Sequence, residues 1–157
     1  MVKKNEKLNP LNGNQNDPQS IRDFNKILKA ARPLWEQFLV KPEKHTARGI
    51  LYTTNDRLHT ADLSFEKPKK RVILMIRLRT NNLSPLQEQS INKVQNESQG
   101  LSSVTFDKNT RMLKIRSQSV LPAAIMAKAV VPQVVKDAVA ILEDDNLKDI
   151  VEQSISY

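Results

Sequence analysis

Apolar residues recur every three or four positions in the first segment of the chain that has a regular pattern. The pattern begins after Ser20, which has the side chain of a helix N-cap and is followed by Asp23 in the capping-box position. A period near 3.6 predicts an amphipathic helix from Ser20 to about Val40. Pro33 lies inside it, and we expect a kink or a restart there because proline lacks an N–H donor. The apolar positions of this stripe are Ile21, Phe24, Ile27, Leu28, Ala31, Trp35 and Phe38.

Between Gly49 and Thr80 the period changes to two, which predicts strands at residues 50–54, 58–66 and 71–79. The register follows from the lengths of the connecting turns. A two-residue loop at Asn55 and Asp56 predicts that Tyr52 pairs with His59 and Ile50 with Ala61. A four-residue loop at residues 67–70 predicts the pairs Phe65 with Val72, Leu63 with Leu74 and Ala61 with Ile76. In this register all of these residues lie on one face of the meander, which is therefore apolar.

A second helix and a hairpin are predicted after the meander. Ser84 is a favoured N-cap residue and Pro85 a favoured first helical residue, while Gly100 suits a C-terminal cap. The turn at residues 107–110 then predicts a hairpin, with positive φ tolerated at Asn109. In this hairpin Val104 and Phe106 pair with Leu113 and Ile115. The apolar positions of the helix are Leu86, Ile91 and Val94.

Helical spacing returns from Ser119 onward, with an expected break at Pro132 and a short last helix around residues 147–151. The predicted fold is therefore an α+β domain. It has a five-stranded, mostly antiparallel sheet packed against N-terminal and C-terminal helices, in the order α-β-β-β-α-β-β-α.

Composition adds a tail and a charge bias. Residues 1–19 are rich in Asn with Pro and Gly, which predicts a disordered tail ahead of a single domain at 20–157. The chain has 25 Lys and Arg against 17 Asp and Glu, a net charge of +8 that favours acidic partners. It has no cysteine, which excludes thiol chemistry and is typical of a reducing compartment. With no apolar leader or membrane span in the sequence, we expect a cytoplasmic protein.

The order of elements, with the Ile91–Asn92 helix end followed by strand, turn and strand, resembles the YbjN family and the wider fold of type III secretion chaperones. The resemblance covers roughly residues 21–142. It implies an antiparallel sheet backed by helices that binds a protein segment, often as a dimer, without catalysis.

The strongest chemical signal is the outward face of the third and fifth predicted strands. Long basic side chains surround a small apolar centre there, which is typical of a protein-binding surface, of a phosphate-binding surface, or simply of a solvated sheet face. We define the outer face as the eight residues Arg71, Ile73, Met75, Arg77, Arg79, Met112, Lys114 and Arg116.

Other residues carry weaker signals. Asp62 and Glu66 lie opposite Met75 and Arg71 in the predicted register, which indicates cross-strand salt bridges rather than an acid–base pair. His59 is expected in the core, and His45 with Glu43 supplies too few ligands for a metal. We therefore expect no catalytic residues, no metal and no cofactor.

These observations favour a non-enzymatic binding or adaptor protein, chaperone-like, that engages a protein segment through the outer face. The expected partner is a protein or peptide, and a homodimer is expected. The alternative is a small basic accessory protein that binds nucleic acid through the same face.

Overall fold

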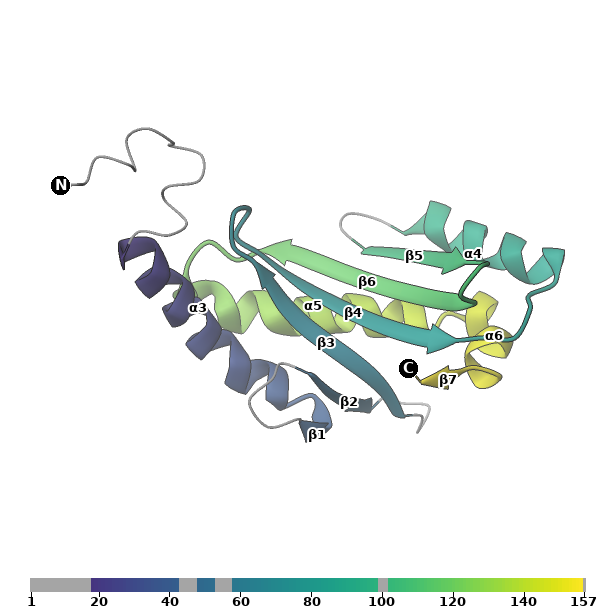
Figure 1. The fold of residues 1–157 in the computed structure, drawn as a ribbon, viewed down its shortest axis with the longest axis horizontal. Helices are drawn as coiled ribbons and strands as arrows, with labels where there is room; N and C mark the ends of the chain where they lie inside the picture. The colour runs from purple at the N-terminus through teal and green to yellow at the C-terminus, as the bar shows by residue number, and fades with distance from the viewer. Residues whose placement is uncertain (1–17, 43–47, 53–57, 99–101, 157) are drawn as a thin grey trace.

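The computed structural model describes residues 18–42, 48–52, 58–98 and 102–156, and these residues form one antiparallel sheet with helices packed on one of its faces (Figure 1). The strand order is β1-β2-β3-β4-β6-β5, and β7 pairs with β4. The strands are β1 (Leu39–Pro42), β2 (Arg48–Tyr52), β3 (Leu58–Glu66), β4 (Arg71–Arg79), β5 (Ser102–Asp107), β6 (Met112–Val120) and β7 (Ile155–Ser156).

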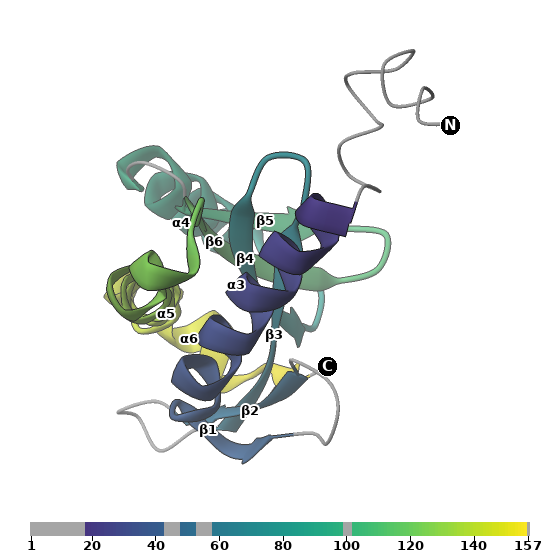
Figure 2. The same ribbon diagram turned by 90° about the vertical axis from the view of Figure 1, so that its left-hand side faces the viewer.

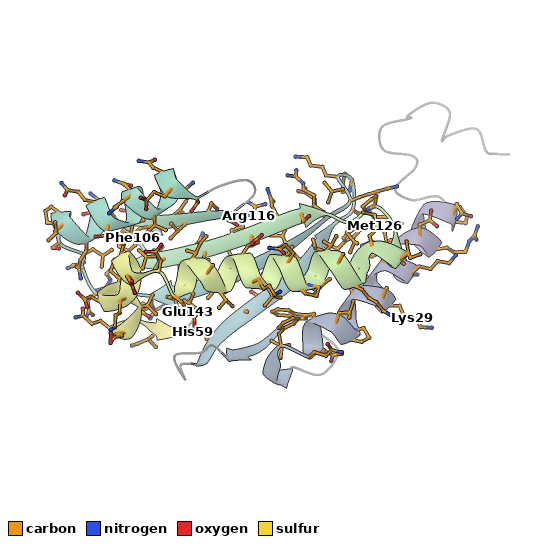
Figure 3. The ribbon with its side chains drawn as sticks, turned by 180° about the vertical axis from the view of Figure 1, so that it is seen from behind. Lys29, His59, Phe106, Arg116, Met126 and Glu143 are labelled. Carbon is orange, nitrogen blue, oxygen red and sulfur yellow. The ribbon has the colours of Figure 1, made fainter. Side chains whose placement is uncertain are left out.

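The helices pack on the sheet and on one another through their apolar faces. The long α5 packs against β4 and β6, and α3 packs against α5 and β1. Figure 3 shows α5 lying across the sheet, and Figure 2 shows α3 crossing in front of the strands with α5 beside it. The smaller α4 packs beside β5. The bounds are α3 (Pro18–Glu36), α4 (Pro85–Glu97), η1 (Ala124–Met126), α5 (Ala127–Leu142), η2 (Asp145–Leu147) and α6 (Lys148–Glu152).

The core lies between the sheet and α3 and α5. Alternation along β4 buries its even-numbered residues under the helices, because successive side chains of a strand point to opposite faces. Trp35 of α3 is fully buried in the same core. The buried residues of the central strands and of α5 are Val72, Leu74, Ile76, Leu78, Leu113, Ile115, Ala127, Val131, Val134, Val135, Ala138, Ile141 and Leu142.

The predicted α+β class is confirmed, but the five-stranded sheet and its order of elements are wrong. The described residues form seven strands, and the two that the sequence did not predict are β1 and β7. Helix α3 ends at Glu36 rather than near Val40, and the chain then enters β1. Phe38 lies between α3 and β1 and still packs against the core. Its apolar spacing is therefore compatible with a longer helix and with the connection that the structure has. The two-residue β7 is too short to show a period.

The prediction for the C-terminal helix was wrong in two respects. Strand β6 continues to Val120, so residues 119 and 120 pair with β4 instead of starting a helix. Helix α5 begins at Ala127 and continues through Pro132, just as α3 continues through Pro33. Burial of the apolar face of each helix outweighs the loss of one intrahelical hydrogen bond at each proline.

One of the two strand registers predicted for the meander is confirmed, and the other is wrong. The β3–β4 register is confirmed, with Phe65 opposite Val72, Leu63 opposite Leu74 and Ala61 opposite Ile76. The β2–β3 register differs by one residue, because His59 pairs with Leu51 instead of Tyr52. Strand β2 ends at Tyr52 and β3 begins at Leu58, so the connection has an odd number of residues, and an odd number reverses the parity that a two-residue loop imposes.

The second hairpin and α4 follow the sequence closely. Val104 pairs with Ile115 and Phe106 with Leu113, as predicted. Ser84 is the N-cap of α4, and its side chain and that of Gln87 form a capping box.

Two local expectations differ in these elements. The positive φ of the hairpin turn is at Arg111 (φ 55°) rather than at Asn109. The C-cap of α4 is Ser98, and Gly100 lies outside the described residues.

Candidate functional site

The eight residues of the outer face lie together on the sheet surface that α5 does not cover. In the β4–β6 register Arg79 pairs with Met112, Arg77 with Lys114, and Met75 with Arg116. Directly opposed residues of an antiparallel pair project from the same face, so the structure assembles this set as the sequence predicts.

Two arginines of the outer face are held in ion pairs. Arg71 Nη2 lies 3.2 Å from Glu66 Oε1, and Arg77 Nη1 lies 2.5 Å from Asp62 Oδ2. The prediction that both carboxylates are cross-strand partners is confirmed, although Asp62 pairs diagonally with Arg77 rather than across to Met75. These pairs offset two of the five positive charges of the outer face.

The remaining outer-face residues make a modest surface. Arg116 donates a hydrogen bond of 3.0 Å to the side chain of Gln118, and Lys114 is exposed. Ile73 and Met75 are half-buried, and Met112 is only 8% exposed. The apolar centre of this face is therefore small.

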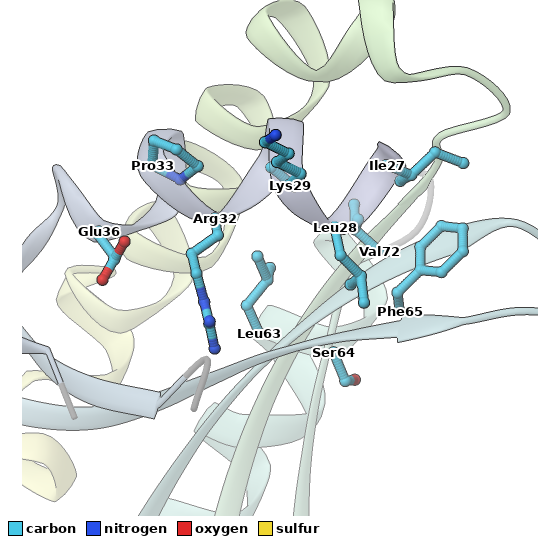
Figure 4. Close-up of a pocket in the computed structure, with 11 residues that line it drawn as sticks. Ile27, Leu28, Lys29, Arg32, Pro33, Glu36, Leu63, Ser64, Phe65 and Val72 are labelled. Atoms are coloured by element: carbon cyan, nitrogen blue, oxygen red, sulfur yellow. The ribbon is translucent and has the colours of Figure 1, made fainter. Parts of the chain in front are cut away.

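A second candidate site lies between α3 and β3, where an open groove of about 480 Å³ separates the helix from the strand (Figure 4). Its volume is within the range of ligand-binding clefts. Leu63, Phe65 and Val72 rise toward α3 from the sheet, and Leu28 points down from the helix. Leu28 is 40% exposed, which is high for a leucine on the inner stripe of a helix. We call this site the α3–β3 groove.

The edge of β3 beside this groove has no strand partner among the described residues. Strand β2 pairs with β3 only from Leu58 to Asp62, whereas β4 pairs with β3 up to Glu66. The segment from Leu63 to Glu66 therefore presents one edge with no described strand against it. Backbone N–H and C=O groups on such an edge can pair with another extended chain.

Aromatic and cationic contacts fix the end of the groove. The rings of Phe24 on α3 and Phe65 on β3 have centroids 5.4 Å apart, and Lys67 Nζ lies 5.2 Å from the Phe24 ring centroid. These contacts join the first half of α3 to the end of β3. The helix is thus held across the strand and the groove remains open between them.

The sequence did not reveal the α3–β3 groove. Ile27, Leu28, Leu63 and Phe65 each fit the inner face of a predicted element, which is the pattern of an ordinary core. The greater exposure of Leu28 depends on how α3 crosses the sheet. The lack of a described strand partner beyond Asp62 depends on where β2 begins, at Arg48.

The expectations for histidine and metal chemistry concern other parts of the chain. His59 is buried in the core, as predicted, whereas His45 lies outside the described residues. Within the described ranges, no group of three or more His, Cys, Asp and Glu side chains is arranged to hold a metal ion. None of the helices in those ranges has the length and apolar content that crossing a bilayer requires.

Comparison of the chain with models of protein families, with curated proteins and with solved structures finds no match in any of the three.

Proposed function

We propose that this protein is a non-enzymatic adaptor that binds an extended protein segment by adding it as a strand to β3 in the α3–β3 groove. The observation that carries the proposal is the coincidence of two features at one place. The edge of β3 from Leu63 to Glu66 lacks a described strand partner, and an apolar groove opens beside it under α3. The first feature supplies main-chain hydrogen bonds and the second supplies a place for side chains.

The spacing of such a segment follows from the sheet, because it would lie beside residues 63–66 of β3. Its residues opposite Phe65 and Leu63 project into the groove, because opposed residues share a face. An apolar residue at every second position therefore suits this site.

The far edge of the sheet offers a contrast. Helix α4 packs beside β5, and Gln95 Oε1 accepts a hydrogen bond of 2.6 Å from the backbone N–H of Val104. A helix that covers an edge and a side chain that occupies its donor hinder strand addition there. Compared with β5, the stretch of β3 from Leu63 to Glu66 is the better docking site.

The alternative, binding of nucleic acid, is favoured by Lys114 and Arg116 on the outer face. The ion pairs of Arg71 and Arg77 weigh against it, because those guanidinium groups already face carboxylates.

Fluorescence anisotropy with a labelled peptide of alternating Thr and Val tests the proposal. We expect saturable binding with a Kd below about 1 mM, a modest affinity of about −4 kcal/mol. Methylation of alternate peptide nitrogens should abolish it, because it removes the donors that strand addition uses. Leu28→Asp should also abolish it, because the carboxylate projects into the groove.

Leu86→Asp is the matched control, since Leu86 is 72% exposed on α4 and distant from the groove. Absence of peptide binding to the wild type would overturn the proposal. So would equal binding by the wild type and the Leu28→Asp variant when circular dichroism shows that both are folded.

A further inference from the structure

We propose that one end of the molecule is a docking surface for an anionic lipid bilayer. This surface, which we call the basic tip, consists of the exposed side of α3, the turn between β3 and β4, and η1 with the first residues of α5. It combines exposed lysines with exposed apolar side chains, a combination typical of peripheral proteins that bind negatively charged membranes. The basic tip does not include the free edge of β3, so the proposal is independent of strand addition.

The packing of α3 against η1 brings lysines from two helices beside an exposed isoleucine. Lys29 of α3 and Lys128 of α5 line one open pocket of about 410 Å³ together with Ile125 of η1. Figure 4 shows Lys29 pointing away from the strands, and Figure 3 shows Lys29 and Met126 at the same end of the molecule. Both lysines are exposed, so two positive charges flank Ile125 on the solvent side.

The apolar side chains of the basic tip are highly exposed. Ile125 is 89% exposed and its neighbour Met126 is 42% exposed. Leu121, shortly before them, is fully buried, and its N–H donates a hydrogen bond of 2.6 Å to the carbonyl group of Lys70. This hydrogen bond holds the start of the segment beside the β3–β4 turn. Side chains exposed to this degree leave water when they enter the interfacial region of a bilayer.

Further cations extend the basic tip along α3 and into the β3–β4 turn. Arg22, Lys26 and Lys29 are all exposed, and their spacing of four and three residues places them on one side of the helix. The turn exposes Lys69 and Lys70. In the described part of the chain none of these four lysines forms an ion pair, so their charges are available to an external partner.

Charge is divided between the two ends of the molecule. Residues 18–36, 64–71 and 119–130, which contain the basic tip, have nine Lys and Arg against three Asp and Glu. Residues 85–97, 107–111 and 143–152 lie at the opposite end in Figure 1 and have four Lys and Arg against eight Asp and Glu. Near an anionic surface this separation turns the basic tip toward the surface and the acidic end away from it.

The side-chain chemistry favours a bilayer over other acidic partners. The cations beside Ile125 are lysines, which act as point charges and lack the bidentate fork of arginine. No exposed aromatic side chain for base stacking lies among the described residues of the basic tip. An outward isoleucine between point charges needs no matching pocket in a bilayer, where lipid headgroups and chains adapt to it.

Cosedimentation of the full chain with large unilamellar vesicles tests the proposal. One set of vesicles is phosphatidylcholine alone, and the other contains about 30% phosphatidylglycerol, which supplies the negative surface. We expect binding to the anionic vesicles at low salt and none to the neutral vesicles. The binding should weaken as salt rises, because salt screens the lysines from the surface.

The double variant Lys29→Glu/Lys128→Glu should lower the partition coefficient on anionic vesicles by at least about 25-fold, because each lysine near such a surface contributes about fivefold. Lys93→Glu/Lys148→Glu, on α4 and α6, is the matched control with the same change in net charge. These lysines lie at the acidic end, beyond the reach of a screened surface, so the control should change the partition coefficient by less than about threefold. Equal losses in the two double variants would show attraction by net charge alone and would overturn the proposal.

Ile125→Ser should weaken binding by at least about tenfold, because the isoleucine no longer removes apolar area from water. Leu86→Ser is its matched control, since Leu86 is 72% exposed on α4 at the acidic end, and it should bind as the wild type does. Unchanged binding by Ile125→Ser would overturn the proposal, as would absence of binding by the wild type to anionic vesicles.

Other occupants of the basic tip give different results with the same variants. A self-associated form in sedimentation that Lys29→Glu/Lys128→Glu dissociates would show that the acidic end of a second copy occupies the tip, which would overturn the proposal. Binding of an oligothymidine that this variant abolishes would assign the tip to nucleic acid and would also overturn it. Peptide binding in the α3–β3 groove is measured without vesicles, so this proposal and the proposed function can each fail alone.

Discussion

Gln95 of α4 accepts, through its side-chain oxygen, a hydrogen bond of 2.6 Å from the backbone N–H of Val104 in β5. Val104 lies on the last strand of the sheet, where no further strand takes this donor in the described part of the chain. One side chain therefore satisfies a backbone group that would otherwise be available for pairing with another molecule. The β3 edge beside α3 has no comparable contact among the described residues.

Replacing Gln95 tests the protection of this edge. Gln95→Ala should lower the free energy of unfolding by about 1 kcal/mol, because the half-buried N–H of Val104 loses its acceptor. Urea unfolding measures this loss, and sedimentation at rising concentration should show increased self-association. Gln95→Glu is the control, because a carboxylate at neutral pH still accepts the hydrogen bond. Unchanged stability and unchanged association in the alanine variant would contradict the role of Gln95.

Trp35 tests the packing of α3. Its side chain is fully buried, so Trp35→Ala should cost about 3–5 kcal/mol through lost burial and the cavity that remains. Ile125→Ala is a surface control that should change stability by no more than about 0.5 kcal/mol, since Ile125 is 89% exposed. A loss below about 1 kcal/mol at Trp35, measured by urea unfolding, would place α3 away from the core.

Two hairpin turns hold residues other than glycine at positive φ, Lys70 at 50° and Arg111 at 55°. Lys70→Gly and Arg111→Gly should each raise stability by about 0.5 kcal/mol, because removing the Cβ relieves more strain than the added backbone entropy costs. The carbonyl groups of both residues accept backbone hydrogen bonds, and these remain after substitution. Thermal unfolding measures the change.

Asn109→Gly is the control for these turns. Asn109 does not have positive φ, so glycine there should lower stability by about 0.5 kcal/mol through backbone entropy alone. If Lys70→Gly and Arg111→Gly lowered stability as much as Asn109→Gly, the strain at these two positions would be disproved.

The outer face provides a test of the nucleic-acid alternative. We expect no saturable binding of an oligothymidine at an ionic strength of about 0.15 M, because the eight outer-face residues include no aromatic side chain for base stacking. Any binding at low salt should weaken steeply as salt rises. Filter binding of the wild type, Lys114→Glu/Arg116→Glu and the remote control Lys136→Glu measures it. Tight binding that resists salt and is lost only in the double variant would favour the nucleic-acid function.

Local sequence signals were sufficient to predict the elements that are specified by a turn or a cap of a few residues. The β3–β4 register follows from the four-residue turn after Glu66, and the second hairpin follows from the turn after Asp107. The start of α4 follows from Ser84 and Pro85. In these cases the turn or cap and the apolar period agree, so each element requires little information from distant parts of the chain.

The tertiary structure decided which strands join the sheet and where each one stops. Strand β7 is held by Leu78 and Arg79, which lie far from it in the sequence. The same apolar residues of α3 fit both a closed core and an open groove. The α3–β3 groove lies where α3 crosses β3 beyond Asp62, the last residue of β3 that pairs with the described part of β2. Such pairing depends on contacts between distant segments, and the period of a single segment contains no information about them.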